Sequence, residues 1–164
     1  MLFSIGYDPR LPDLANKLNA QVIDVRARPS GRVKAGWKAA DLARTFGDRY
    51  EWHGRTLGGR AFVAGSDEWI EAPAEVLKPL AKRGKKENLI LLCACWQPWE
   101  CHRYNEILKP ILGLKTSQVD ALHIFGDQLI ETSELADTDI TGRPYDYFDL
   151  SDWMYQHNYR GTKR

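Results

Sequence analysis

The chain contains the apolar run Leu89-Ile90-Leu91-Leu92-Cys93, and this run decides the fold class. An unbroken apolar run of this length is typical of a strand that is buried on both faces, and such strands occur in parallel sheets covered by helices. The run therefore predicts a strand inside an α/β sheet.

Short apolar runs elsewhere in the chain alternate with segments of helical periodicity. Further strands are expected at residues 2–5, 22–25, 50–53 and 121–125, with one more reaching Ile130. Helices are expected from Pro12, from about Lys38 to Gly47, from Ser66 through Leu80, and over about 101–111. This alternation predicts a three-layer α/β fold with a mostly parallel, open sheet of about five strands and helices on both faces.

The length of 164 residues fits a single α/β domain over residues 1–164. Within it, residues 126–164 form an acidic C-terminal extension in which a closing helix is expected over 152–158. No apolar run approaches the ~20 residues needed to cross a bilayer, and the first residues lack the pattern of a signal peptide. We expect a soluble, cytoplasmic protein with no membrane partner, whose three cysteines are reduced thiols or metal ligands.

The net charge of +1 hides an uneven distribution along the chain. Residues 24–38 carry five basic side chains and one acid, whereas residues 127–152 carry eight acids and one arginine. Two oppositely charged solvated faces would explain this pattern. The alternative is an anion site in the first half of the chain, edged by the acidic segment.

Chemically unusual residues follow each of the first four expected strands. They lie at Gly6-Tyr7, from Asp24 to Arg32, from His53 to Arg60, and from Cys93 to Arg103. Because the carboxyl ends of parallel strands lie on one edge of a sheet, we expect these four loops to meet in a single cleft.

In this arrangement the chain resembles the bacterial and archaeal family called domain of unknown function 488. The matching pieces are Ser4-Ile5-Gly6-Tyr7, Asp24-Val25-Arg26, Pro29-Ser30-Gly31-Arg32, Leu57-Gly58-Gly59-Arg60, Cys93-Ala94 and Cys101-His102-Arg103. They occur in the family's order and span a family-like core of about residues 3–112. The resemblance implies a three-layer α/β domain and brings no established reaction. The chain departs from the family at Cys95, where the run typically reads Cys-Ala-Glu.

Cys101 is a candidate nucleophile. It is expected at the start of a helix, where free backbone N–H groups and neighbouring His102 and Arg103 would lower the pKa of its thiol. The competing interpretation is that Cys101 packs under the sheet while His102 and Arg103 hydrogen-bond to neighbouring loops. For Cys93, at the end of a buried strand, a role as a small core residue is favoured.

Arginines are the second group of candidates. A guanidinium beside free backbone donors is a good receptor for phosphate, so Arg103 is a candidate anion ligand, reinforced by Arg26, Arg32 and Arg60. Arg26 has a competing role, because it could pair with Asp24. Asp24 interrupts an apolar strand, so its carboxylate should be either paired or poised for proton transfer.

The remaining candidates are weaker. His53 is a candidate general base or an ordinary structural histidine. Gly58 and Gly59 would let the backbone approach a phosphate. Tyr7, Trp96 and Trp99 could stack on a nucleobase or cover the core.

A metal site is the less favoured interpretation of the cysteine-rich run. Zinc sites usually take paired ligands from two separated turns, and the spacing of the three cysteines with His102 fits that pattern poorly. We therefore expect no metal and no cofactor.

These observations favour an enzyme that acts on a phosphorylated, nucleotide-like or nucleic-acid substrate in a cleft lined by arginine, cysteine and histidine. A non-enzymatic nucleic-acid or nucleotide-binding module is the alternative, and a protein-interaction domain is a third possibility. The sequence leaves the oligomeric state open.

Overall fold

The structure is a computed structural model, and it describes residues 1–30, 33–95, 101–114, 119–131 and 148–149. It has one sheet of seven strands in the order β3-β2-β4-β1-β5-β6-β7. The expected α/β class is confirmed. The sheet has more than the expected five or so strands, because the chain beyond β5 turns back and adds two antiparallel strands at one edge. The first of them is the strand expected to reach Ile130, and β7 was not expected.

The elements follow the chain in a regular alternation over its first half. The strands are β1 (Leu2–Ile5), β2 (Ala20–Asp24), β3 (Tyr50–Trp52), β4 (Asn88–Leu92), β5 (Ala121–Phe125), β6 (Gln128–Glu131) and β7 (Phe148–Asp149). The helices are α1 (Leu11–Lys17), α2 (Ala39–Phe46), the short 3-10 helix η1 (Gly47–Arg49), α3 (Gly54–Leu57), α4 (Arg60–Ala64), α5 (Ala74–Gly84), the π-helix η2 (Arg103–Leu108) and α6 (Lys109–Gly113).

Strand β4 contains most of the apolar run from Leu89 to Cys93, and it lies between β2 and β1. It pairs in parallel with both neighbours, with Leu89 opposite Gln21 on one side and opposite Leu2 on the other. Strands β3 and β5 extend the parallel part of the sheet on either side. All five parallel strands therefore end at one edge.

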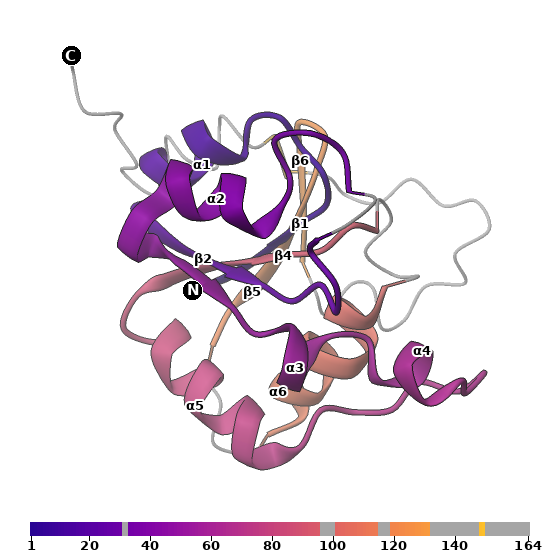
Figure 1. Cartoon of the computed structure of the whole chain (residues 1–164). Coiled ribbons are helices and arrows are strands. Elements are labelled where there is room, and N and C mark those ends of the chain that lie inside the picture. Colours follow the sequence, from indigo (N-terminus) through magenta and orange to yellow (C-terminus); the bar gives the residue numbers. More distant parts are fainter. Residues whose placement is uncertain (31–32, 96–100, 115–118, 132–147, 150–164) are drawn as a thin grey trace.

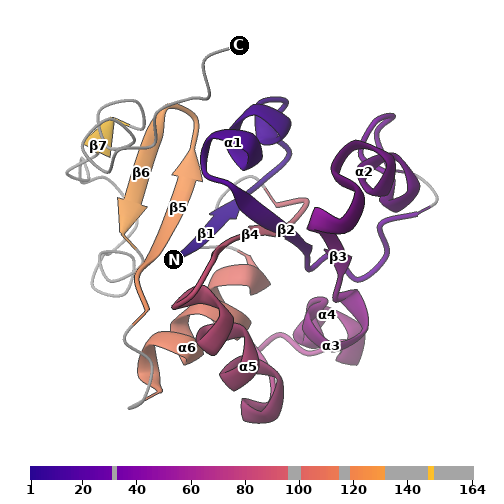
Figure 2. The same cartoon turned by 90° about the vertical axis from the view of Figure 1, so that its left-hand side faces the viewer.

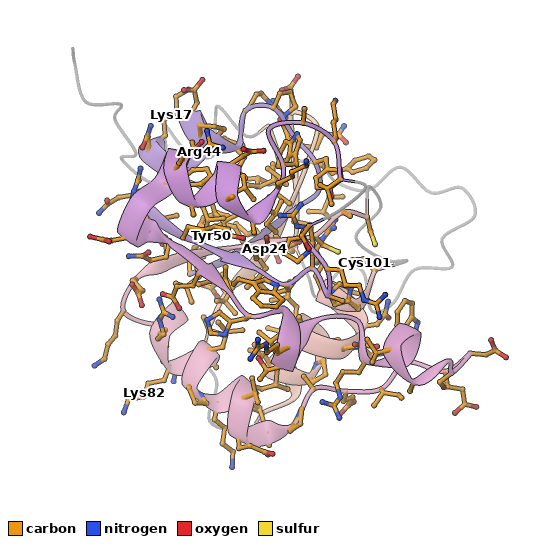
Figure 3. All side chains as sticks on the ribbon, viewed as in Figure 1. Lys17, Asp24, Arg44, Tyr50, Lys82 and Cys101 are labelled. Atoms are coloured by element: carbon orange, nitrogen blue, oxygen red, sulfur yellow. The ribbon has the colours of Figure 1, made fainter. Side chains whose placement is uncertain are left out.

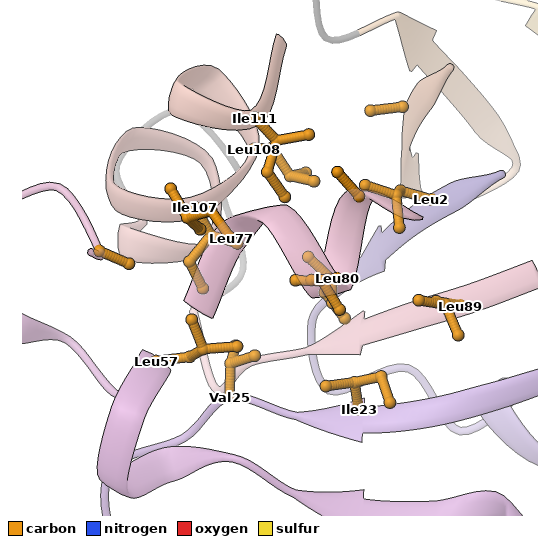
Figure 4. Packing of buried hydrophobic residues seen from close by; sticks show 14 of the residues in the cluster. Leu2, Ile23, Val25, Leu57, Leu77, Leu80, Leu89, Ile107, Leu108 and Ile111 are labelled. Atoms are coloured by element: carbon orange, nitrogen blue, oxygen red, sulfur yellow. The ribbon is translucent and has the colours of Figure 1, made fainter. Parts of the chain in front are cut away.

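Helices cover both faces of the sheet, as expected. Helices α1 and α2 lie on one face, while α3, α5 and α6 lie on the other (Figures 1 and 2). On the second face, Leu77 and Leu80 of α5 pack with Ile107, Leu108 and Ile111 over the strands (Figure 4). The buried residues of both faces form the core on which the loops at the strand ends rest.

Two helix boundaries differ from the expectation. The helix expected from Ser66 begins at Ala74 instead, because Pro73 has an extended backbone and opens α5. The helix expected from about Cys101 begins two residues later as η2, a π-helix, and continues as α6. The closing helix expected over 152–158 lies outside the described residues.

A search of the described helices for one that could span a membrane found none of sufficient length and hydropathy.

Candidate functional site

A pocket of about 500 Å³ opens at the edge of the sheet where the parallel strands end. It is lined by residues from the loops after β1, β2 and β4, together with Gly59 and Trp69. Tyr7, Arg28, Cys93, Cys95 and His102 contribute to its wall, and we call it the thiol pocket. Loops far apart in the sequence therefore meet here, as the positions of the strand ends predicted.

A second pocket of about 420 Å³ adjoins it, and it is rich in arginine. Arg28, Arg55 and Arg60 line this arginine pocket, and no acidic side chain is among the described residues of its wall. Ala27 and Arg28 line both pockets, so the two spaces share this part of the β2 loop. The Nε atom of Arg60 is buried and has no hydrogen-bond partner in the described part of the chain.

Gly58 lets the two loops approach closely. A Cβ atom at Gly58 would lie 2.2 Å from the carbonyl oxygen of Gly54 and 2.6 Å from the Cα of Ala27. The next residue, Gly59, has a φ of +55°, which side-chain-bearing residues rarely adopt. Both glycines thus serve the shape of the wall between the pockets, which is a narrower role than the expected phosphate contact.

Three sulfur atoms meet at the floor of the thiol pocket. The Sγ atoms of Cys93, Cys95 and Cys101 lie within 4.8 Å of one another, and we call these residues the sulfur cluster. The Sγ atoms of Cys93 and Cys95 are 3.7 Å apart. Figure 3 shows Cys101 on the side of the molecule where the strands end.

The imidazole of His102 faces the same cluster. Its Nδ1 atom lies 3.7 Å from the Sγ of Cys93 and 3.8 Å from the Sγ of Cys101. Its Nε2 atom lies 2.9 Å from the carbonyl oxygen of Val25, which can only accept a hydrogen bond. Nε2 therefore carries a proton, and Nδ1 faces the sulfur atoms. Nδ1 offers them a lone pair when the imidazole is neutral and an N–H when it is charged.

The cluster separates the pKa values of its members. Hydrogen bonds from Cys101 and Cys95 hold the pKa of the Cys93 thiol well below its usual value. Burial, together with the neighbouring Cys93, raises the pKa of Cys101. For His102, burial opposes the charged form, but the interactions with Cys93 and Cys95 outweigh it and raise the pKa to about 10.

These directions correct the prediction for Cys101. A helix N-terminus and His102 were expected to make it the reactive thiol, but its side chain is fully buried and its pKa is raised. The cause is the packing of its sulfur between other thiols and the core. Cys93 is the cysteine with the lowered pKa, and it also lines the pocket.

Asp24 is held in a buried ion pair. The Nε atom of Arg26 lies 2.8 Å from Oδ1, and Nη2 lies 2.5 Å from Oδ2. The hydroxyl of Tyr50 donates to Oδ2 at 2.7 Å, and Asp24 and Tyr50 can be located in Figure 3. The carboxylate is thus saturated with donors, which supports the structural alternative and leaves Asp24 out of proton transfer.

Arg26 is committed to the same arrangement. It also donates to the carbonyl oxygen of Trp37 at 2.7 Å and to the hydroxyl of Tyr7 at 3.1 Å. The ring of Tyr7 lies 4.9 Å from that of Trp37, centroid to centroid. Arg26 therefore braces the loops after β1 and β2, and the expectation that it binds an anion is not supported by its contacts.

Arg103 is fully buried, which overturns its expected role as the main anion ligand. It donates to the carbonyl oxygen of Cys95 at 2.6 Å and to the Oγ of Ser4 at 3.3 Å. Ser4 in turn hydrogen-bonds the Nδ1 of His123, whose pKa burial lowers well below its usual value. The guanidinium is therefore part of a polar row inside the core, and Arg103 is not among the described residues that line either pocket.

Of the other predicted site residues, one lines a pocket, one does not, and three are outside the described part of the chain. His53 faces Glu51, with 2.9 Å between Nε2 and Oε2, and it is not among the described residues that line either pocket. Arg60 does line the arginine pocket. Arg32, Trp96 and Trp99 lie outside the described residues.

Several residues of the site were not predicted. Arg28 and Arg55 join Arg60 in the arginine pocket, and Trp69, half-exposed, lines the thiol pocket. Glu106 is buried and accepts hydrogen bonds from the backbone N–H groups of Arg60 and Ala61 at 2.6 and 2.8 Å. A lone acid within an apolar helical segment was the only signal for Glu106.

Comparisons with models of protein families, with curated proteins and with solved structures gave no match. The resemblance to domain of unknown function 488 therefore stays a prediction.

Proposed function

We propose that this protein is an enzyme that acts on a phosphorylated, nucleotide-like substrate bound across the two adjoining pockets. The observation that carries the proposal is the shared wall at Ala27 and Arg28. This shared wall connects the arginine pocket, which is lined by three guanidinium groups, with the thiol pocket, which is lined by cysteine sulfurs and the His102 imidazole. The substrate's phosphate would lie in the arginine pocket and the rest of the molecule in the thiol pocket.

The arginine pocket has the chemistry of a phosphate receptor. Guanidinium groups match phosphate oxygens with paired hydrogen bonds, and three of them line this one space. Because the described wall contains no carboxylate, the positive charge is not neutralised there by an acidic side chain. The Nε atom of Arg60 has no hydrogen-bond partner among the described residues, and a shift of the side chain would turn this buried donor toward a phosphate oxygen.

The thiol pocket has room and aromatic surface for a base. Trp69 is 50% exposed and lines the pocket together with Tyr7. Stacking on such a ring contributes ~1–3 kcal/mol per base in nucleic-acid complexes. Both rings thus support a substrate that carries a nucleobase.

The reacting groups in this proposal are the Cys93 sulfur and the His102 imidazole, since both line the thiol pocket. Asp24 and His53 are left out because of their partners, and Cys101 because of its burial. The cytoplasm suits this site, because its reducing conditions keep thiols from forming disulfides.

Binding of a nucleoside monophosphate and of the matching nucleoside, measured by calorimetry, tests the substrate class. We expect the monophosphate to bind more tightly, and Arg60→Gln to weaken it by about tenfold, or ~1.4 kcal/mol. Arg44→Gln is the matched control, because Arg44 is an exposed arginine on α2 that lines neither pocket. Equal affinity for the two ligands, or equal losses in the two variants, would refute the phosphate site.

The alternative is a nucleotide-binding module without turnover, and exposed Trp69 is the observation that favours it. Incubation of the protein with nucleotides, followed by phosphorus NMR, separates the two. Conversion that is lost in His102→Gln supports the enzyme. Unchanged nucleotides, with salt-sensitive binding that survives Cys101→Ser, support the binding module.

A further inference from the structure

We propose that the sulfur cluster binds one zinc ion through its three cysteine sulfurs and the Nδ1 atom of His102. Zinc binding can be tested without the proposed function, because four side chains can hold zinc whether or not the pockets take a nucleotide. Zinc held by all four would occupy the Cys93 sulfur and the His102 imidazole, so these two groups would react with a substrate only in the zinc-free protein. It replaces the expectation, drawn from sequence spacing, that the cysteine-rich run carries no metal.

The distances match a tetrahedral zinc site. Zinc–sulfur bonds of about 2.3 Å and a zinc–nitrogen bond of about 2.0–2.1 Å place sulfur ligands about 3.8 Å apart and sulfur about 3.6 Å from nitrogen. The structure has 3.7 Å between the sulfurs of Cys93 and Cys95. Nδ1 of His102 lies 3.7 and 3.8 Å from the sulfurs of Cys93 and Cys101. Three of the distances between the four donor atoms therefore match those of a tetrahedral site, and the three sulfurs lie within 4.8 Å of one another.

The orientation of His102 also suits a ligand. A metal-binding imidazole commonly donates its second N–H to a carbonyl oxygen, which fixes the ring and its tautomer. Here Nε2 donates to the carbonyl oxygen of Val25 at 2.9 Å. The lone pair of Nδ1 is thereby directed at the cluster, and the ion would be tied to the end of β2.

A positively charged side chain lies beside the zinc ligands and can balance the charge of the zinc complex. Zinc with three thiolates and a neutral imidazole carries one net negative charge, which is expensive to bury alone. The guanidinium of Arg103 lies 3.6 Å from the sulfur of Cys101, so a positive charge adjoins the ligands. Three sulfurs and one imidazole nitrogen form a donor set that favours zinc over harder ions such as magnesium and calcium.

The distance between the ligand atoms answers the objection from spacing. Cys101 and His102 are neighbours in the sequence and were expected to point in different directions from the start of a helix. In the structure both residues precede η2, which begins at Arg103, and their ligand atoms come within 3.8 Å of each other. Binding of Zn²⁺ to three thiolates and a neutral imidazole releases three protons from the four side chains, and no electron is transferred.

Metal analysis of the full chain tests the site. After loading with zinc and gel filtration, we expect about one zinc per chain. Cobalt in its place should give the visible absorption of tetrahedral Co²⁺ and thiolate charge-transfer bands. His102→Ala should weaken zinc by more than the ~10–100-fold typical of losing an outer-shell partner. His53→Ala, a histidine outside the pocket walls, is the matched control.

Alkylation provides a second measurement that needs no variant. Bound zinc should protect the cysteines from iodoacetamide, and a strong chelator should expose them. Less than about a tenth of a zinc per chain after loading would overturn the proposal. So would a chain mass lowered by two hydrogens with loss of two titratable thiols, since that result means a disulfide. Neither measurement involves a nucleotide. A protein that binds no zinc can therefore be distinguished from one that binds no nucleoside monophosphate.

Discussion

Asp24 shows how a single carboxylate can organise the loop after β2. It is fully buried, and its two oxygens accept from Arg26 and Tyr50. Such a pair is costly to break because the remaining charge loses its partner inside the protein. The hydrogen bond to Asp24 also raises the pKa of Tyr50, in addition to the effect of burial.

We expect Asp24→Asn to lower the free energy of unfolding by about 3–5 kcal/mol, since it leaves the buried guanidinium of Arg26 without a counter-charge. Urea unfolding followed by circular dichroism measures the change. Asp67→Asn, at an exposed position, should stay within about 0.5 kcal/mol of the wild type. A loss below about 1 kcal/mol for Asp24→Asn would contradict this account.

For single residues, the sequence predicted an ion pair best where the two partners lie close together in the chain. The pairing of Asp24 with Arg26 could be foreseen because only one residue separates them. The burial of Arg103 could not, because its partner Ser4 lies on β1, at the other end of the chain. The donor atoms of Cys93, Cys95, Cys101 and His102 come from ten consecutive positions, but their spacing alone did not show that the side chains converge.

At the scale of elements, the strands β1, β2 and β4 could be predicted because apolar runs bounded by turn residues are a local signal. The start of α5 was misplaced because Ser66-Asp67-Glu68 resembles a helix start. The π-helix η2 has no such local signal, since its wider turn depends on packing.

The N-terminus of α4 is held by a side chain from η2. Both carboxylate oxygens of Glu106 accept backbone N–H groups, at Arg60 and Ala61. We expect Glu106→Gln to lower the free energy of unfolding by about 1–2 kcal/mol, because an amide keeps one acceptor and loses the charge.

The same variant should weaken nucleoside monophosphate binding, since Arg60 is the first residue of α4. Calorimetry alongside urea unfolding measures both effects. Glu75→Gln, an exposed acid in the first turn of α5, is the control. Unchanged stability in Glu106→Gln would show that these hydrogen bonds do not hold the helix.

Gly58 offers a test of the wall between the two pockets. In Gly58→Ala the new Cβ would meet the backbone at Gly54 and Ala27, which cannot move aside as a flexible side chain would. We expect a loss of about 1–3 kcal/mol from this overpacking, together with weaker monophosphate binding.

Gly113→Ala is the matched control for this position. Gly113 ends α6, and a Cβ there would meet nothing within 4 Å. Thermal unfolding should show little change or a slight gain in stability for it. Similar melting temperatures for the two variants would mean that the loop after β2 has room to shift.

At the scale of the whole molecule, Glu51 links the edge of the sheet to the helical layer. Its carboxylate accepts from Arg83 of α5 at 2.8 and 2.9 Å and faces His53. The hydrogen bonds from Arg83 lower the pKa of Glu51 despite partial burial. Asp8 has a lowered pKa as well, because hydrogen bonds from Arg10 outweigh its burial.

A carboxyl group whose pKa is lowered by folding stabilises the protein above its unfolded pKa, near ~4.3 for Glu. That contribution is lost as the pH falls through the folded value. We therefore expect the stability of the wild type to decline below about pH 5. Glu51→Gln should be less stable than the wild type at neutral pH and should converge with it in acid, which urea unfolding at a series of pH values measures. Parallel curves for the two proteins would contradict the link.

The central position of β4 in the sheet also determines when, during synthesis, the sulfur cluster can form. Leu2 of β1 pairs with Leu89 of β4, and β2 pairs with β4 on its other side, so β1 and β2 have no direct contact along the sheet. During synthesis, the first 87 residues leave the ribosome before this register can form. The centre of the sheet must then close over a long separation, which is slow compared with local pairing. Since Cys93 to His102 follow β4 directly, the chain can gather its sulfur atoms only after β4 has been synthesised.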